Sequence, residues 1–128
     1  MTPPQLTFHS RPAERLDRLA QEIERLVDSH ESGATRQRWV TVQMAPLLER
    51  SIGVLAAVAA EIGPDQPEGR RVLATRDLVA AHLRAAADIE AADVRPEILT
   101  NLLVRAGSQL VERVGSTRSA EISRVAHP

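Results

Sequence analysis

Hydrophobic positions recur at spacings of three and four residues over most of this chain, which is the period of an amphipathic helix. Ser10 is a candidate N-cap, and Pro12 suits the first turn of a helix. The pattern then continues until Ser32-Gly33 interrupts it. We therefore predict a helix over roughly residues 11–31. Its inward-facing positions are Leu16, Leu19, Ala20, Ile23, Leu26, Val27 and His30.

A second helical pattern extends from about Ala34 to Ile62 and contains Pro46. A proline inside a helix removes one backbone hydrogen bond and clashes with the carbonyl four residues earlier. Two alternatives follow. The segment is one helix with a kink near Met44-Ala45, or it is two helices and Pro46 begins the second. Because the pattern keeps its phase through Pro46, we favour the single kinked helix. Its apolar positions are Trp39, Met44, Leu47, Leu48, Ile52, Leu55, Val58, Ala59 and Ile62.

A third helix is expected after the Gly-Pro turn at residues 63–64, which stops the second. The four residues from Asp65 to Glu68 have the sequence of a capping box, with Pro67 in the first turn. The helical pattern then continues to about Ala92. The positions expected to be buried are Val72, Val79, Leu83, Ala86 and Ile89.

Asp93, Pro96 and Glu97 mark the start of a fourth helix. Its apolar positions are Ile98, Leu99, Leu102, Leu103, Ala106, Leu110 and Val114. The pattern thins after the Gly-Ser-Thr sequence at 115–117, although Ile122 and Val125 fit one or two further turns. We therefore expect the main helix to end near residue 117.

Four amphipathic helices joined by short connections predict an all-α protein, an antiparallel four-helix bundle with a kinked second helix near Pro46. The bundle domain is expected over residues 10–117. Residues 1–9 contain Pro3 and Pro4 and little to bury, so they are interpreted as a flexible arm. Residues 118–128 are expected to form a frayed tail or a short helix.

Composition agrees with a single helical domain. The chain has 128 residues, of which 43% are hydrophobic, and this length supports a core without disulfides or metals. Neither cysteine nor lysine is present, which excludes thiolate metal sites, cysteine nucleophiles and Schiff-base chemistry on a side chain. The formal net charge of −1 argues against a dedicated nucleic-acid or anionic-membrane binder.

Signals for targeting are missing from the sequence. The chain start has no basic and apolar segments of a secretory signal. The longest apolar run, Ile52 to Ala60, is far shorter than the ~18 residues that a membrane span requires. We therefore expect a cytoplasmic protein without a membrane span. Its sixteen cations are all arginine, which is typical of a GC-rich bacterial genome.

Motifs for metals and cofactors are also missing. Paired Glu-x-x-His sequences of di-metal bundles, His-x-x-x-His, Gly-x-Ser-x-Gly and glycine-rich phosphate loops do not occur. We therefore expect no metal and no cofactor. With only Phe8 and Trp39 as aromatic residues, the chain is also poorly equipped for a small-molecule pocket.

Arg76, Asp77 and His82 are the candidate catalytic residues. An arginine, a polar residue and a histidine six positions after the arginine resemble the Arg-x4–6-His motif of HEPN-domain ribonucleases, which are helical and dimeric. The resemblance implies that Arg76 holds the scissile phosphate, with Asp77 as its polar neighbour and His82 as acid or base. The alternative is structural: His82 lies at a packing boundary and Arg76 points to solvent.

Trp39, Ala57 and Ala86 are the candidate interface residues. Ala-rich segments such as 56–60 and 85–92 allow close helix packing, within the bundle or between subunits. Trp39 is expected in the core, with an interface as the alternative, because tryptophan is enriched at binding hot spots. The preferred function is a non-enzymatic protein–protein interaction module, as a homodimer or as the partner of a larger protein. The metal-independent ribonuclease or toxin that uses Arg76 and His82 is the alternative.

Overall fold

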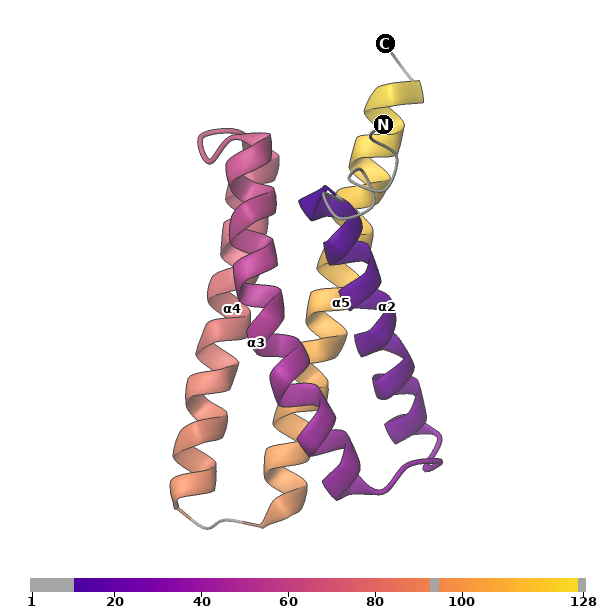
Figure 1. Ribbon diagram of the computed structural model, residues 1–128, viewed down its shortest axis with the longest axis vertical. Helices are drawn as coiled ribbons and strands as arrows, with labels where there is room; N and C mark the ends of the chain where they lie inside the picture. The colour runs from indigo at the N-terminus through magenta and orange to yellow at the C-terminus, as the bar shows by residue number, and fades with distance from the viewer. Residues whose placement is uncertain (1–10, 93–94, 127–128) are drawn as a thin grey trace, which may run out of the picture.

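The computed structural model describes residues 11–92 and 95–126, which form four helices joined by short connections (Figure 1). These helices are α2 (Pro12–Glu31), α3 (Gln37–Ile62), α4 (Pro67–Ala91) and α5 (Pro96–Ala126). In the described part of the chain no residue is in a strand. The predicted all-α class is therefore confirmed.

Successive helices point in opposite directions and pack side by side as an antiparallel bundle (Figure 1). Each helix contacts its neighbours in the sequence, and α2 also contacts α5, which closes the bundle. α3 and α5 touch across the middle, whereas α2 and α4 make no contact over the residues that the structure describes. The cross-section is therefore a rhombus with α3 and α5 on its short diagonal.

The core is formed by aliphatic side chains from all four helices. α5 approaches α2 and α3 closely at Gly107, where an added Cβ would lie 2.9 Å from Cγ2 of Ile23 and 3.1 Å from Cε of Met44. The periodic positions predict most of this core correctly. Its buried members are Leu16, Leu19, Ala20, Ile23, Val27, Val40, Met44, Leu47, Leu48, Leu55, Val58, Ala59, Val72, Val79, Ala86, Leu103, Val104, Ala106, Leu110 and Val114.

Besides Trp39, which is described below, two apolar residues expected on the inward faces are exposed instead. Ile62 is 37% exposed and Ile98 is 45% exposed. Ile62 is the last residue of α3, and Ile98 lies in the first turn of α5. Ile62 lies on the buried side of α3 at the end of that helix, whereas Ile98 lies ~140° around the axis of α5 from buried Leu103 and so faces outward.

α3 continues through Pro46 without interruption, which confirms one helix rather than two. Pro46 has no N–H to donate to the carbonyl of Val42. Both residues are exposed, so water can hydrogen-bond to that carbonyl. An internal proline is therefore tolerated at this position, while a kink at Pro46 stays a prediction.

The helix starts differ from those expected. The N-caps of α2, α3 and α4 are Arg11, Arg36 and Gln66, and none of them makes a side-chain capping hydrogen bond. The predicted capping box from Asp65 to Glu68 is therefore wrong, because the first turn begins one residue later. Ser10, the expected cap of the first helix, lies outside the described residues.

The connection between α3 and α4 depends on two glycines. Gly63 has φ +115°, a conformation that side chains disfavour. Gly69, in the first turn of α4, is buried against the same connection. A Cβ on Gly69 would lie 2.0 Å from the carbonyl oxygen of Gly63, so only glycine fits without backbone movement.

α5 does not end near residue 117 as the sequence predicts. The Gly-Ser-Thr sequence at 115–117 is helical, and α5 continues to Ala126. The predicted arm at residues 1–9 lies outside the described residues. Among the helices that the structure describes, none combines the length and apolar character needed to cross a membrane.

Candidate functional site

Arg76, Asp77 and His82 lie on α4, and each already has a local partner. The guanidinium of Arg76 donates to Oδ1 of Asp77 through Nε at 3.1 Å and Nη2 at 2.9 Å. Nδ1 of His82 lies 2.8 Å from the carbonyl oxygen of Leu78 and donates to it. In the neutral form of this half-buried imidazole, the bond leaves Nε2 as the acceptor.

Within one chain the helix does not bring Arg76 and His82 together. Six residues of helix separate their side chains by ~120° around the axis and ~9 Å along it. Arg76 and His82 can therefore share a cleft only if another element or a second chain joins them. The ribonuclease interpretation stays a prediction, and α4 alone does not assemble its site.

The two alanines predicted at an interface occupy different environments. Ala86 is 6% exposed and belongs to the core of this chain. Ala57 is half-buried on α3. Only Ala57 therefore offers surface to another chain in the folded protein.

Trp39 is 56% exposed, so the expectation that it lies in the core is wrong. It is the third residue of α3, beside the connection from α2. At this end of the bundle α2 covers only one side of α3, and the indole lies against a cavity rather than beneath another helix. This exposure fits the interface interpretation better than the core interpretation.

Two cavities lie between α2 and α3, one toward the start of α2 and the other beside its end. The larger, about 490 Å³, is lined by Arg15, Arg18, Leu19, Glu22, Arg50, Gly53 and Val54. The other, about 380 Å³, is lined by Glu22, Arg25, Leu26, Ser29, Thr35, Trp39, Gln43, Leu47 and Arg50. Because both include Glu22 and Arg50, we treat them as one feature, the α2–α3 groove.

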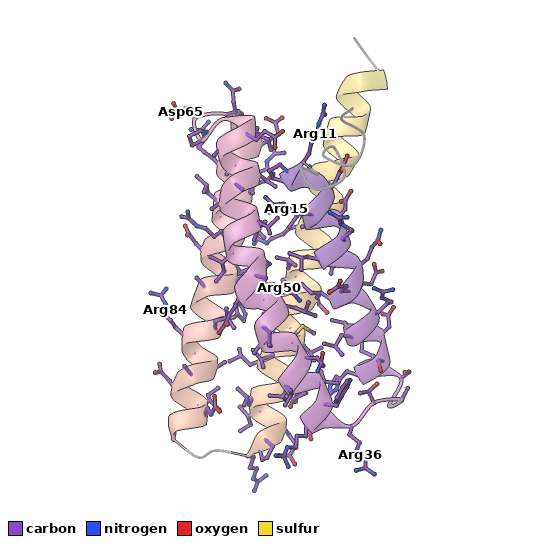
Figure 2. The ribbon with its side chains drawn as sticks, in the orientation of Figure 1. Arg11, Arg15, Arg36, Arg50, Asp65 and Arg84 are labelled. Carbon is purple, nitrogen blue, oxygen red and sulfur yellow. The ribbon has the colours of Figure 1, made fainter. Side chains whose placement is uncertain are left out.

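The α2–α3 groove is rich in arginine. Four guanidinium groups line it, from Arg15, Arg18, Arg25 and Arg50, against the single carboxylate of Glu22. Figure 2 shows Arg15 and Arg50 in the space between the two helices. The groove therefore carries a clear positive excess in a chain whose formal net charge is −1.

Glu22 offsets this excess only weakly. Its Oε2 lies 4.0 Å from Nη2 of Arg50, and the two side chains are 45% and 64% exposed. Exposed ion pairs of this kind stabilise by about 0–1 kcal/mol. An incoming anionic group can therefore compete with Glu22 for Arg50.

Apolar and hydroxyl side chains complete the groove. Leu26 and Val54 are half-buried and show part of their surface between the charged residues. Near Trp39, the hydroxyls of Ser29 and Thr35 hydrogen-bond to each other and tie the end of α2 to the connection before α3. The groove thus offers cations and apolar surface together.

The arginines of the groove were not among the residues predicted from sequence. Arg15, Arg18 and Arg25 repeat at three and seven residues along one edge of α2, so helical period could have identified that edge. Arg50 comes from another helix, and no local signal relates it to the others. The spacing of charged residues could therefore identify the α2 side of the groove. Only the packing of α2 against α3 adds Arg50.

No metal site is assembled by the side chains that the structure describes. In residues 11–90, 92 and 95–115, which carry those side chains, no group of three His, Asp or Glu is placed to hold a metal ion. In comparisons with known proteins, no family model, no curated protein and no solved structure matches this chain. The site must therefore be interpreted from its own geometry.

Proposed function

We propose that this protein is a non-enzymatic helical interaction module whose binding site is the α2–α3 groove. The observation that carries the proposal is the groove itself, which combines four arginines with an exposed tryptophan. Tryptophan and arginine are the residue types most enriched at binding hot spots. The bound protein is a second copy of the chain or a larger partner.

The geometry favours binding over catalysis. The groove has no histidine, no cysteine and no second carboxylate beside Glu22, so it lacks a pair of groups for acid–base or nucleophilic chemistry. The histidine with the best motif, His82, is on α4 and does not line it. A binding role uses the groove as it stands.

Site-specific photocrosslinking tests this proposal. The chain has no cysteine, so Gln43→Cys places a single thiol in the groove for a benzophenone label. Arg84→Cys is the matched control, because Arg84 is exposed on α4 and points away from the groove (Figure 2). Each labelled protein is irradiated in an extract of the cells that make it, and adducts are identified by mass spectrometry.

We expect one dominant adduct from position 43 and little from position 84. An adduct with the same chain identifies a homodimer, and an adduct with a different protein identifies a larger assembly. Failure to form adducts at position 43, or equal and unselective adducts at both positions, would contradict the proposal.

A further inference from the structure

We propose that the α2–α3 groove binds an amphipathic helix of a partner protein that carries carboxylates beside an apolar stripe. This inference rests on the proposed function and adds the chemistry of the partner. Three features of the groove support this partner: its positive charge, its length and its mixture of cations with apolar surface.

Most charged residues of α2 form two rows along the helix, with Glu22 among the arginines. Arginines follow the edge beside the groove: Arg15, Arg18 and Arg25. Carboxylates follow the other edge: Glu14, Asp17, Glu24 and Asp28. The two rows are centred roughly 100° apart around the helix axis. An acidic segment is therefore attracted to the arginine row and repelled from the carboxylate row. This pattern of charge favours one position of the segment on α2.

The dimensions of the groove fit a short helix. Its lining extends from Arg15 to Ser29 on α2 and from Trp39 to Val54 on α3. At 1.5 Å per residue, each side is roughly 21–23 Å long, or about four turns. The three arginines of α2 lie at i, i+3 and i+10, so carboxylates at the same spacing on a bound helix can meet them.

Apolar surface in the groove favours a peptide over a nucleic acid. Leu26, Val54 and the exposed indole of Trp39 require apolar groups on the partner. Single-stranded nucleic acids instead need several aromatic stacking platforms along a cationic channel. The groove contains one aromatic residue, Trp39.

Tryptophan fluorescence of the full chain provides the test, because Trp39 is its sole tryptophan and tyrosine is absent. The probe is a helical peptide of about 16 residues, roughly 24 Å long, with leucine at i and i+4 and glutamate on the flanks. Control peptides replace each glutamate by glutamine or lysine. An oligouridine of similar charge is the nucleic-acid control.

Charge reversal locates the binding site. Arg15→Glu and Arg25→Glu change exposed groove residues, and Arg84→Glu is the matched control on α4. We expect the glutamate peptide to shift the Trp39 emission with a Kd in the micromolar range and to weaken with added salt. Each groove substitution should raise the Kd by about three- to tenfold, and Arg84→Glu should leave it unchanged.

Several results would overturn the inference. These are no binding of the glutamate peptide up to about 1 mM, equal binding of the lysine peptide, tighter binding of oligouridine, or equal weakening by Arg84→Glu. If position 43 still crosslinks to a partner, only the stated chemistry of the partner is wrong. If neither peptide binding nor crosslinking occurs, the proposed function fails as well.

Discussion

Individual side chains on the inward faces of the helices differ widely in their burial, and this difference predicts their energetic roles. Leu55 is 1% exposed, whereas Leu102 is half-buried at the margin of the core. Both belong to the inward faces predicted from sequence. Only the structure separates a residue enclosed on every side from one at the edge.

Leu55→Ala is expected to lower the free energy of unfolding by ~2–5 kcal/mol, because it removes buried methyl groups and leaves a cavity. Leu102→Ala should cost less, because solvent already reaches its side chain and no closed cavity forms. Urea denaturation followed by circular dichroism measures both. Equal costs for the two variants would show that the inward face is assigned incorrectly.

Two helical glycines give opposite predictions. Gly53 is exposed and has no atom within 4 Å of an added Cβ, so Gly53→Ala should stabilise by up to ~1 kcal/mol through helix propensity. Gly107→Ala gains the same propensity, but its Cβ would lie 2.9 Å from Cγ2 of fully buried Ile23. Overpacking costs ~1–3 kcal/mol, so net destabilisation is expected. Thermal melts that rise for both variants would contradict this account of the core.

His82 tests the ribonuclease interpretation directly. Its Nδ1 is bound to the carbonyl of Leu78, so His82→Ala should lower stability by about 1 kcal/mol or less through loss of that hydrogen bond. We expect no cleavage of single-stranded RNA by the natural chain. Metal-independent cleavage that His82→Ala abolishes, with the melting temperature unchanged, would contradict this expectation.

At the scale of one element, α3 is the helix that combines an internal proline with a central position in the bundle. It contains an internal proline, contacts all three other helices and lines the α2–α3 groove. Pro46 and Val42 lie on its exposed face, where water compensates for the missing hydrogen bond. The helix is therefore held in place by packing rather than by its intrinsic propensity.

Pro46→Ala is expected to stabilise the protein by ~1–3 kcal/mol, because it restores an N–H donor for the carbonyl of Val42 and relieves the ring clash. Glu49→Ala, exposed nearby on the same helix, is the control and should change stability by less than ~0.5 kcal/mol. Chemical denaturation measures both. A lower stability for Pro46→Ala would mean that the bundle is packed around a bend that proline maintains.

At the scale of the whole molecule, the oligomeric state distinguishes binding of a second copy of the chain from binding of a different protein. The homodimer form predicts a dimer at micromolar concentration and dissociation of that dimer by Ala57→Arg, because Ala57 is half-buried about one helical turn beyond Gly53 and Val54 of the groove. Ala86→Arg should unfold the chain in either form, since its position is 6% exposed and a buried guanidinium is costly. Sedimentation velocity with circular dichroism distinguishes these outcomes. A strict monomer at high concentration would leave only the form with a different partner.

The four helices and most of the core follow from the sequence by itself. Apolar spacing of three and four residues defines an inward face locally, and Gly, Pro and short polar segments end each helix. Three details escaped this reasoning: the first turn of α4, the continuation of α5 past residue 117, and the exposure of Ile62 and Ile98. Each lies at an end of a helix, where local signals compete with packing.

The α2–α3 groove was decided only by tertiary structure. Trp39 lies ~140° around the axis of α3 from buried Met44, and only the structure shows how much of that face the neighbouring helix covers. Similarly, Arg15 and Arg50 are 35 positions apart in sequence and share a cavity only because α2 and α3 pack side by side. The periodicity of one helix fixes which face turns inward. The angles and overlaps between helices depend on how the inward faces of all four helices fit together. The groove is a consequence of these angles and overlaps.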